Sequence, residues 1–170
     1  VNGNLSFGQA VSTYTPDAIP GLTLPTIAAW FADVDLRGNQ GDLHMCVDTD
    51  AHQLMFTWDQ VGYYSQKTDK LNSFQIILTH NDLSVCGAAE TFNIEFRYEQ
   101  LQWTTGDASN GVDGLGGTPA TAGIDAGDTI NAVALPGSHT GAALDLVNLT
   151  NANEPGAFVF LVAAGTLPAC

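Results

Sequence analysis

The fold is decided by the stretch from Phe92 to Gly123, which reads FNIEFRYEQLQW up to Trp103 and TTGDASNGVDGLGGTPATAG after it. In the first part, apolar and polar side chains alternate, as in a strand with one buried face. The second part is mostly glycine and small residues, and its only charged residues are Asp107 and Asp113. Together the two parts predict a strand at a sheet edge that leads into a long, shaped loop.

The rest of the chain consists of short strand-like segments separated by Gly, Pro, Asn and Asp turns. No segment keeps a period of 3.6 residues and no pattern repeats at a fixed interval, which argues against helical and repeat folds. We therefore predict an all-β fold, an antiparallel β-sandwich of about ten short strands with long glycine-rich loops. The other predicted strands cover residues 5–7, 11–14, 26–31, 43–47, 53–64, 72–79, 130–135, 142–149 and 157–163.

Length and composition predict one folded domain. The chain has 170 residues, of which 45% are hydrophobic and 13% charged, so it can bury a core. We expect a single domain over residues 1–170, with its core roughly within residues 5–163. The side chains predicted to anchor the core or the strand ends are Trp30, Trp58, Phe74, Phe96, Trp103 and Phe158.

The charge balance excludes several partner classes. Four Lys and Arg residues stand against eighteen Asp and Glu residues, a formal charge of -14 at pH 7. Nucleic acids and anionic lipids both require clustered cations, so neither is an expected partner. The sequence contains no apolar run long enough to span a membrane. These features suit a secreted or surface protein and argue against membrane insertion.

One acidic turn is a candidate calcium site. Asp33, Asp35, Asn39 and Asp42 place oxygen-bearing side chains along a glycine-containing turn, and Ca²⁺ prefers oxygen ligands. The alternative is an ordinary turn in which the carboxylates accept backbone hydrogen bonds. Asp107 and Asp113, together with Trp103, form a second candidate surface for a ligand or partner. They can join the calcium site only if the two loops meet in space.

The three cysteines allow a disulfide but no zinc or haem motif. Cys46 falls in a predicted strand and Cys86 in a loop after another, so a Cys46–Cys86 bond is possible in an oxidising compartment. Cys170 is the last residue, and the sequence leaves open whether it is free or bonded within or between chains.

Catalytic motifs are weakly represented. The four histidines are scattered, and the grouping of Ser138, His139 and Asp145 into a triad is a coincidence that a chain of this size commonly offers. Glu95 and Glu99 lie on the polar face of one predicted strand, which is more often a solvated face than a cleft. We expect no enzyme activity; a hydrolase dependent on His139 is the alternative.

Short blocks of sequence, in order along the chain, carry a resemblance to a known family: Trp30–Asp35, Thr57–Tyr64, Lys67–Gln75, Phe96–Trp103, Thr104–Ala108, Gly114–Gly117, Ala122–Gly123, Leu135–Ser138, Asn153–Gly156 and Phe158–Val162. In these blocks the chain resembles the nidogen-like extracellular domain family, and their sequence is most similar to that of bacterial surface members. This resemblance implies a non-catalytic extracellular module of cell–matrix adhesion, with a matrix or surface protein or glycan, or another copy, as partner. It supplies no catalytic residues.

Two other functions stay open from the sequence. A small domain could add a terminal strand, from residues 1–15 or 158–164, to a neighbour's sheet and so build an extracellular filament. Alternatively, the acidic turn and the tryptophans could form a calcium-dependent carbohydrate-binding module.

Overall fold

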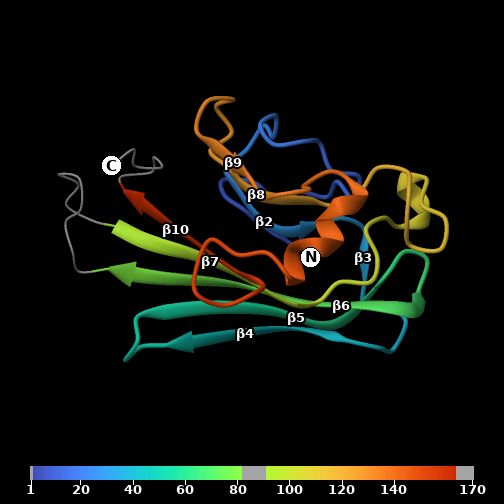
Figure 1. Ribbon diagram of the computed structural model, residues 1–170, viewed down its shortest axis with the longest axis horizontal. Coiled ribbons are helices and arrows are strands. Elements are labelled where there is room, and N and C mark those ends of the chain that lie inside the picture. Colours follow the sequence, from blue (N-terminus) through green and yellow to red (C-terminus); the bar gives the residue numbers. More distant parts are fainter. Residues whose placement is uncertain (1, 82–90, 164–170) are drawn as a thin grey trace.

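A computed structural model describes residues 2–81 and 91–163, which form two antiparallel sheets packed face to face (Figure 1). The prediction of an antiparallel β-sandwich is confirmed. Within the described residues the strands are β1 (Asn4–Ser6), β2 (Thr26–Phe31), β3 (Val34–Asp35), β4 (Asp42–Asp48), β5 (Gln53–Tyr63), β6 (Lys67–Asn81), β7 (Thr91–Gln100), β8 (Thr121–Asp125), β9 (Ala132–Ala134) and β10 (Ala157–Ala163). Two short 3-10 helices accompany them, η1 (Asp107–Ser109) and η2 (Gly141–Val147).

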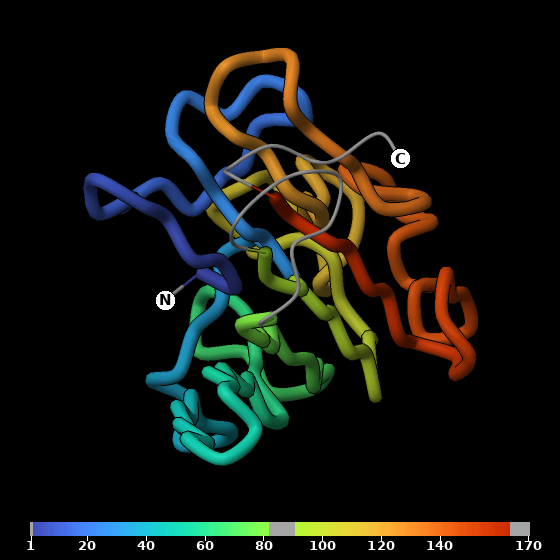
Figure 2. The backbone as a smooth tube through the Cα atoms, turned by 90° about the vertical axis from the view of Figure 1, so that its left-hand side faces the viewer, coloured from blue at the N-terminus to red at the C-terminus, as the bar shows by residue number. Residues whose placement is uncertain are grey.

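The two sheets differ in size. The smaller sheet has the strand order β1-β2-β8-β9, and its strands are three to six residues long. The larger sheet has the order β10-β7-β6-β5, and both β3 and β4 pair with the outer edge of β5. Figure 2 shows the larger sheet curling away beneath the smaller one toward β4. Part of its inner face therefore extends past the smaller sheet.

Alternation along the central strands produces the two faces of the larger sheet. Trp58, Phe74 and Tyr98 lie in one row across β5, β6 and β7 and face the core, where the rings of Trp58 and Phe74 stack 5.1 Å apart. Their neighbours Thr57 and Gln75 lie in the adjacent row and face outward, joined by a 2.7 Å hydrogen bond. Each large side chain buried in this way stabilises the fold by about 1.5–3 kcal/mol.

Trp30 of β2 joins the smaller sheet to the larger one. Its ring lies between 6.4 and 6.5 Å from the rings of Phe74, Tyr98 and Trp103. The Tyr98 hydroxyl also donates a 2.8 Å hydrogen bond across the core to the carbonyl oxygen of Ala29, and burial raises the pKa of this hydroxyl well above its usual value. All six predicted anchors are buried, so this part of the sequence prediction is confirmed.

The predicted sheet edge at residues 92–98 is wrong. β7 lies inside the larger sheet, between β6 and β10. Its second neighbour is β10, whose side chains Phe158 and Val162 pack into the same core. Sequence alternation reports that one face of a strand is buried, but it does not report how many neighbours the strand has.

Two predicted strands do not form. Residues 142–149 instead contribute most of η2, because the Thr140 hydroxyl accepts a hydrogen bond from the Ala142 N–H at its start and Ala143 and Leu146, three residues apart, are buried. Residues 11–14 form no strand, and the carbonyl oxygen of Thr13 accepts a hydrogen bond from the Asn2 side chain.

Candidate functional site

The two loops that the sequence singled out meet at one end of the sandwich, on the right of Figure 1. The turn between β5 and β6 links them: the Tyr64 N–H donates to the Asp33 carbonyl oxygen, and the Asp107 N–H donates to the Tyr64 carbonyl oxygen, both at 3.0 Å. We call this region the acidic loop end. Its carboxylates are those of Asp33, Asp35, Asp69, Asp107 and Asp113.

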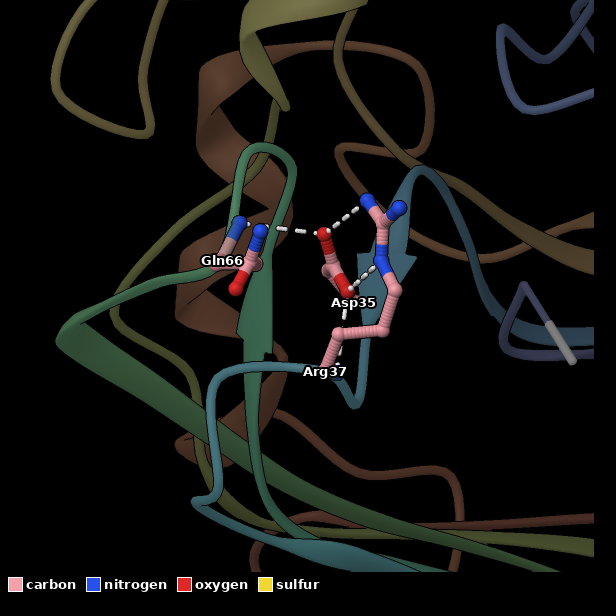
Figure 3. A network of polar contacts seen from close by, with 3 residues as sticks. All are labelled: Asp35, Arg37 and Gln66. Carbon is pink, nitrogen blue, oxygen red and sulfur yellow. Dashed lines mark hydrogen bonds and ion pairs between the residues drawn. The ribbon is translucent and has the colours of Figure 1, made fainter.

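Asp35 is held by hydrogen bonds on both of its oxygens (Figure 3). Oδ1 accepts from the Arg37 backbone N–H and from Arg37 Nε at 3.0 and 2.8 Å. Oδ2 accepts from Arg37 Nη2 at 2.6 Å and from the Gln66 N–H at 3.0 Å. The Arg37 hydrogen bonds lower the pKa of Asp35 to about 2. Asp35 therefore fixes the turn after β3 to the β5–β6 turn. Its hydrogen bonds are those of an ordinary hydrogen-bonded turn, the predicted alternative to a calcium site.

Asp33 is the opposite case. The residue is only 8% exposed, and its Oδ2 has no hydrogen-bond partner among the described residues. Burial raises its pKa to about 6; the charges of Asp35 and Asp107 act in the same direction, while Arg37 partly offsets them. The acidic loop end thus combines one carboxyl group that is stabilised as an anion with one that is not.

Close backbone packing brings the second loop onto Asp33. A Cβ atom built on Gly106 would lie 2.8 Å from the Asp33 Cβ and 3.2 Å from its Oδ2. The 2.8 Å distance leaves no room for a side chain unless Asp33 shifts, and the 3.2 Å distance would also require its carboxyl group to give way by a few tenths of an ångström. Glycine at this position is what allows the Trp103–Gly117 loop to cover Asp33 directly.

The root of the second loop is buried in the core. Trp103 has no exposed surface, and its Nε1–H donates a 3.0 Å hydrogen bond to the Val61 carbonyl oxygen. The fully buried Asn72 accepts from the N–H groups of Gln102 and Trp103 at 2.7 and 3.2 Å, and donates to the Trp103 carbonyl oxygen at 3.0 Å. Trp103 therefore supports the loop from inside and does not present a surface to a partner. Sequence reasoning did not single out Asn72.

The loop is closed by its own hydrogen bonds. The N–H groups of Thr104 and Thr105 both donate to the Gly114 carbonyl oxygen, at 2.7 and 3.0 Å, and the Thr105 hydroxyl donates to the Gly116 carbonyl oxygen. This closure presents Asp107 and Asp113 at the surface, where both are exposed. A partner can reach these two residues, together with exposed neighbours such as Val112 and Leu115.

Further charges surround the same end. The Tyr63 hydroxyl donates a 2.9 Å hydrogen bond to Asp69. Burial and Asp69 raise the pKa of Tyr63, and the charges of Asp107 and Asp113 add to this effect, so these carboxylates act on one common region. The Arg37 guanidinium lies over the Tyr64 ring, 5.6 Å from its centre, and supplies positive charge at the rim.

The predicted calcium ligands do not all lie together. Asp35 pairs with Gly62 of β5 and Asp42 pairs with Asp59, which separates them by about 10 Å along the strand. Asn39 lies exposed between them. Among residues 2–81 and 91–163, no three His, Cys, Asp or Glu side chains are grouped as metal ligands. The calcium site stays a prediction.

One of the three cysteines lies among the described residues. Cys46 lies exposed on β4 with a free thiol, while Cys86 and Cys170 lie outside the described residues, so the disulfide stays a prediction.

The Ser138 hydroxyl accepts from the Ala122 N–H, and His139 Nδ1 lies 3.0 Å from the Thr121 hydroxyl. Both contacts fasten the turn after β9 to β8.

Asp33 should make stability depend on pH. The pKa of Asp33 is about 6 in the folded state against 3.8 for a free side chain. The contribution of Asp33 to the free energy of unfolding is therefore fully present below about pH 4 and is lost as the pH rises through about 6. We expect Asp33→Asn to raise the free energy of unfolding at pH 7.5 by about 1–2 kcal/mol, after allowance for partial screening by solvent. Urea denaturation at about pH 4 and about pH 7.5 measures this difference, which should shrink at the lower pH.

Asp35→Asn is the matched control. The pKa of Asp35 is lowered on folding, so its contribution is present above about pH 4 and is lost as the pH falls toward about 2. Asp35→Asn should therefore destabilise the protein at pH 7.5. Equal effects of the two substitutions on stability would contradict the assigned environments.

Sequence comparisons with known proteins found one family model and several related chains. A family model described as the nidogen-like domain matches residues 48–164, a range that contains the whole Trp103–Gly117 loop. Over 95% of its length, the chain is 33% identical to alpha-tectorin from Mus musculus, 30% identical to alpha-tectorin from Gallus gallus and 30% identical to nidogen from Drosophila melanogaster. The chain spans 8% of the length of these tectorins and 13% of the length of this nidogen. No solved structure matches it. Within the described residues, no helix is long and apolar enough to cross a membrane.

Proposed function

Because this chain belongs to the nidogen-like domain family, we propose that it is a non-catalytic extracellular module that binds a matrix or cell-surface molecule through its acidic loop end. The observation that carries this proposal is the placement of Asp107 and Asp113 on a closed loop whose root is fixed in the core. Loops held by a rigid scaffold are where binding residues of β-sandwich proteins concentrate.

The charges of this end favour a cationic partner. Asp107 and Asp113 are exposed, and they act together with Asp69 on the hydroxyl of Tyr63. Complementary charge speeds association and selects among partners, and the formal charge of -14 on the whole chain acts in the same direction. A basic patch on a matrix or surface protein is the partner that these features fit.

A binding assay with paired variants tests the proposal. The biotinylated domain is applied to decellularised matrix and to cultured cells at physiological salt, and its saturable binding is measured. We expect Asp107→Asn/Asp113→Asn to weaken binding about tenfold, equivalent to about 1.4 kcal/mol. The control Asp50→Asn/Asp145→Asn removes the same number of exposed carboxylates elsewhere and should leave binding within about twofold. Absence of saturable binding, or equal losses in both double variants, would overturn the proposal.

The filament and the calcium-dependent carbohydrate module stay predictions. Two assays on the purified domain distinguish these functions from adhesion. Polymers of the purified domain on electron microscopy would support the filament. Binding to a glycan array that requires calcium and is abolished by a chelator would support the carbohydrate module.

A further inference from the structure

The two outer edges of the larger sheet are protected differently. At the β10 edge, the side chain of Asn151 takes the place of a neighbouring strand: it accepts a 2.8 Å hydrogen bond from the Val159 N–H and donates a 3.1 Å hydrogen bond to the Val159 carbonyl oxygen. The Thr150 hydroxyl donates to the Ala157 carbonyl oxygen at 2.7 Å on the same strand. These side chains block strand addition at β10, because they use the backbone groups that a new strand would need.

The opposite edge, β4, is less protected in the described part of the chain, where Asp42 Oδ1 accepts a 2.8 Å hydrogen bond from the Leu43 N–H at one end of the strand. β4 pairs with β5 over its whole length, from Asp42 to Asp48, and no other described strand pairs with it; it is the lowest strand in Figure 1. Its sequence, DLHMCVD, contains no lysine, arginine or proline, the residues that usually guard an edge. Antiparallel pairing with β5 uses the backbone groups of alternate residues of β4, and the outward N–H and C=O groups of the residues between them are a template for strand addition.

The inner face of β4 is apolar and uncovered. Met45 is 66% exposed and Val47 is 61% exposed, although they pair with Phe56, which packs against the core, and with Leu54, two residues before Phe56 on the same face of β5. The smaller sheet does not reach these two residues. A groove of about 780 Å³ begins beside Val47 and is walled by apolar side chains that include Leu54, Leu78 and Phe92. A strand added to β4 would place every second side chain next to Met45 and Val47.

Charge decides between the possible occupants of this edge. If β4 of a second copy paired with it in full antiparallel register, Asp42 would face Asp48 at both ends, and like charges opposite one another destabilise a strand pair. The formal charge of -14 on each copy adds to this repulsion. A segment with cationic ends faces neither penalty, since each of its ends would lie opposite an aspartate.

We propose that the free edge of β4 binds an extended segment of a partner protein by antiparallel strand addition. The segment carries apolar side chains opposite Leu43, Met45 and Val47 and lysine or arginine opposite Asp42 and Asp48. This surface uses none of the carboxylates of the acidic loop end, so it is a second interaction surface beyond the proposed function.

A designed peptide tests this surface directly. The probe is a fluorescein-labelled, N-acetylated and C-amidated peptide, Lys-Val-Thr-Val-Thr-Val-Lys, and the matched peptide has glutamate at both ends. We expect saturable binding of the lysine peptide by fluorescence anisotropy and at least about tenfold weaker binding of the glutamate peptide. Hydrogen exchange should show added protection of β4 amides in the complex. Equal binding of both peptides, or binding of neither, would overturn the proposal.

Substitutions on the two edges locate the site. Val47→Lys should weaken binding of the lysine peptide at least about tenfold, because it places a like charge in the apolar row. The control Val159→Lys makes the same change on the capped β10 edge and should leave binding within about twofold. Asp107→Asn/Asp113→Asn should likewise leave peptide binding within about twofold, so failure of the adhesion proposal is distinguishable from failure of this one. A dimer that sedimentation detects in the wild type but not in Val47→Lys would assign the edge to a second copy and overturn the proposal.

Discussion

Replacing Trp103 with alanine is expected to lower the free energy of unfolding by about 3–5 kcal/mol, the usual range for removal of a large aromatic side chain from a core. The side chain is fully buried, and its ring centre lies 5.5 Å from that of Tyr63 and 6.5 Å from that of Trp30. Its Nε1–H also satisfies the buried Val61 carbonyl oxygen. The substitution therefore removes packing, a hydrogen bond and the anchor of the Trp103–Gly117 loop together.

Urea denaturation followed by far-ultraviolet circular dichroism measures this loss. Trp103→Phe keeps a buried ring but leaves the Val61 carbonyl oxygen unpaired, so we expect it to cost about 1–3 kcal/mol. The phenylalanine variant also provides a folded sample if the alanine variant does not fold, since a loss of 5 kcal/mol approaches the whole stability of some domains, about 5–15 kcal/mol. A cost below about 1 kcal/mol for alanine would show that Trp103 is not the loop's anchor.

Side-chain alternation was enough to predict most of the larger sheet. In β7, apolar residues recur at every second position from Phe92 to Tyr98, and the structure places Ile94, Phe96 and Tyr98 in the core. β10 was predicted with the bounds that the structure gives it. Alternation is informative here because each of these strands carries large side chains that distinguish its faces.

In the smaller sheet, β2 was predicted with its observed bounds, but β8 was missed because its sequence lacks that contrast. β8, Thr121–Asp125, is buried at all five positions and consists largely of small residues, so the sequence placed its beginning in the glycine loop. Gly123 shows why small residues are needed: a Cβ on it would lie 2.2 Å from the Val133 carbonyl oxygen of β9. A strand packed this closely has no alternation to detect, and its partners are known only from the folded chain.

The candidate site could be predicted as two acidic loops but not as one region. The contact between Asp33 and Gly106 joins residues far apart in the sequence, and no local pattern fixes such a contact. The pairing of Asp35 with Arg37 had a local signal, since only Leu36 separates the two residues, but the competing calcium pattern used the same carboxylate. Asn72 carried a weaker signal: asparagine is uncommon in strands, and here it marks a buried strand position with a special role.

Asn72→Ala is expected to destabilise the protein by about 3–4 kcal/mol, because it leaves two buried backbone groups and one partly buried backbone group without their partner. Each buried group that loses its partner costs about 1–3 kcal/mol before water or local movement compensates. The affected groups are the N–H groups of Gln102 and Trp103 and the Trp103 carbonyl oxygen. Denaturation in urea gives the size of the loss, and faster hydrogen exchange at Gln102 and Trp103 would assign it to these groups.

The matched control lies three residues along the same strand. Gln75 also loses an amide hydrogen bond when replaced with alanine, but it lies on the outer face and bonds only the Thr57 hydroxyl, so Gln75→Ala should cost less than about 1 kcal/mol. If Asn72→Ala costs no more than Gln75→Ala, the loop is held by Trp103 packing alone. If the Asn72 effect is large and disappears in a Trp103→Ala background, the two residues act as one anchor, because the energies of residues that share a network do not add.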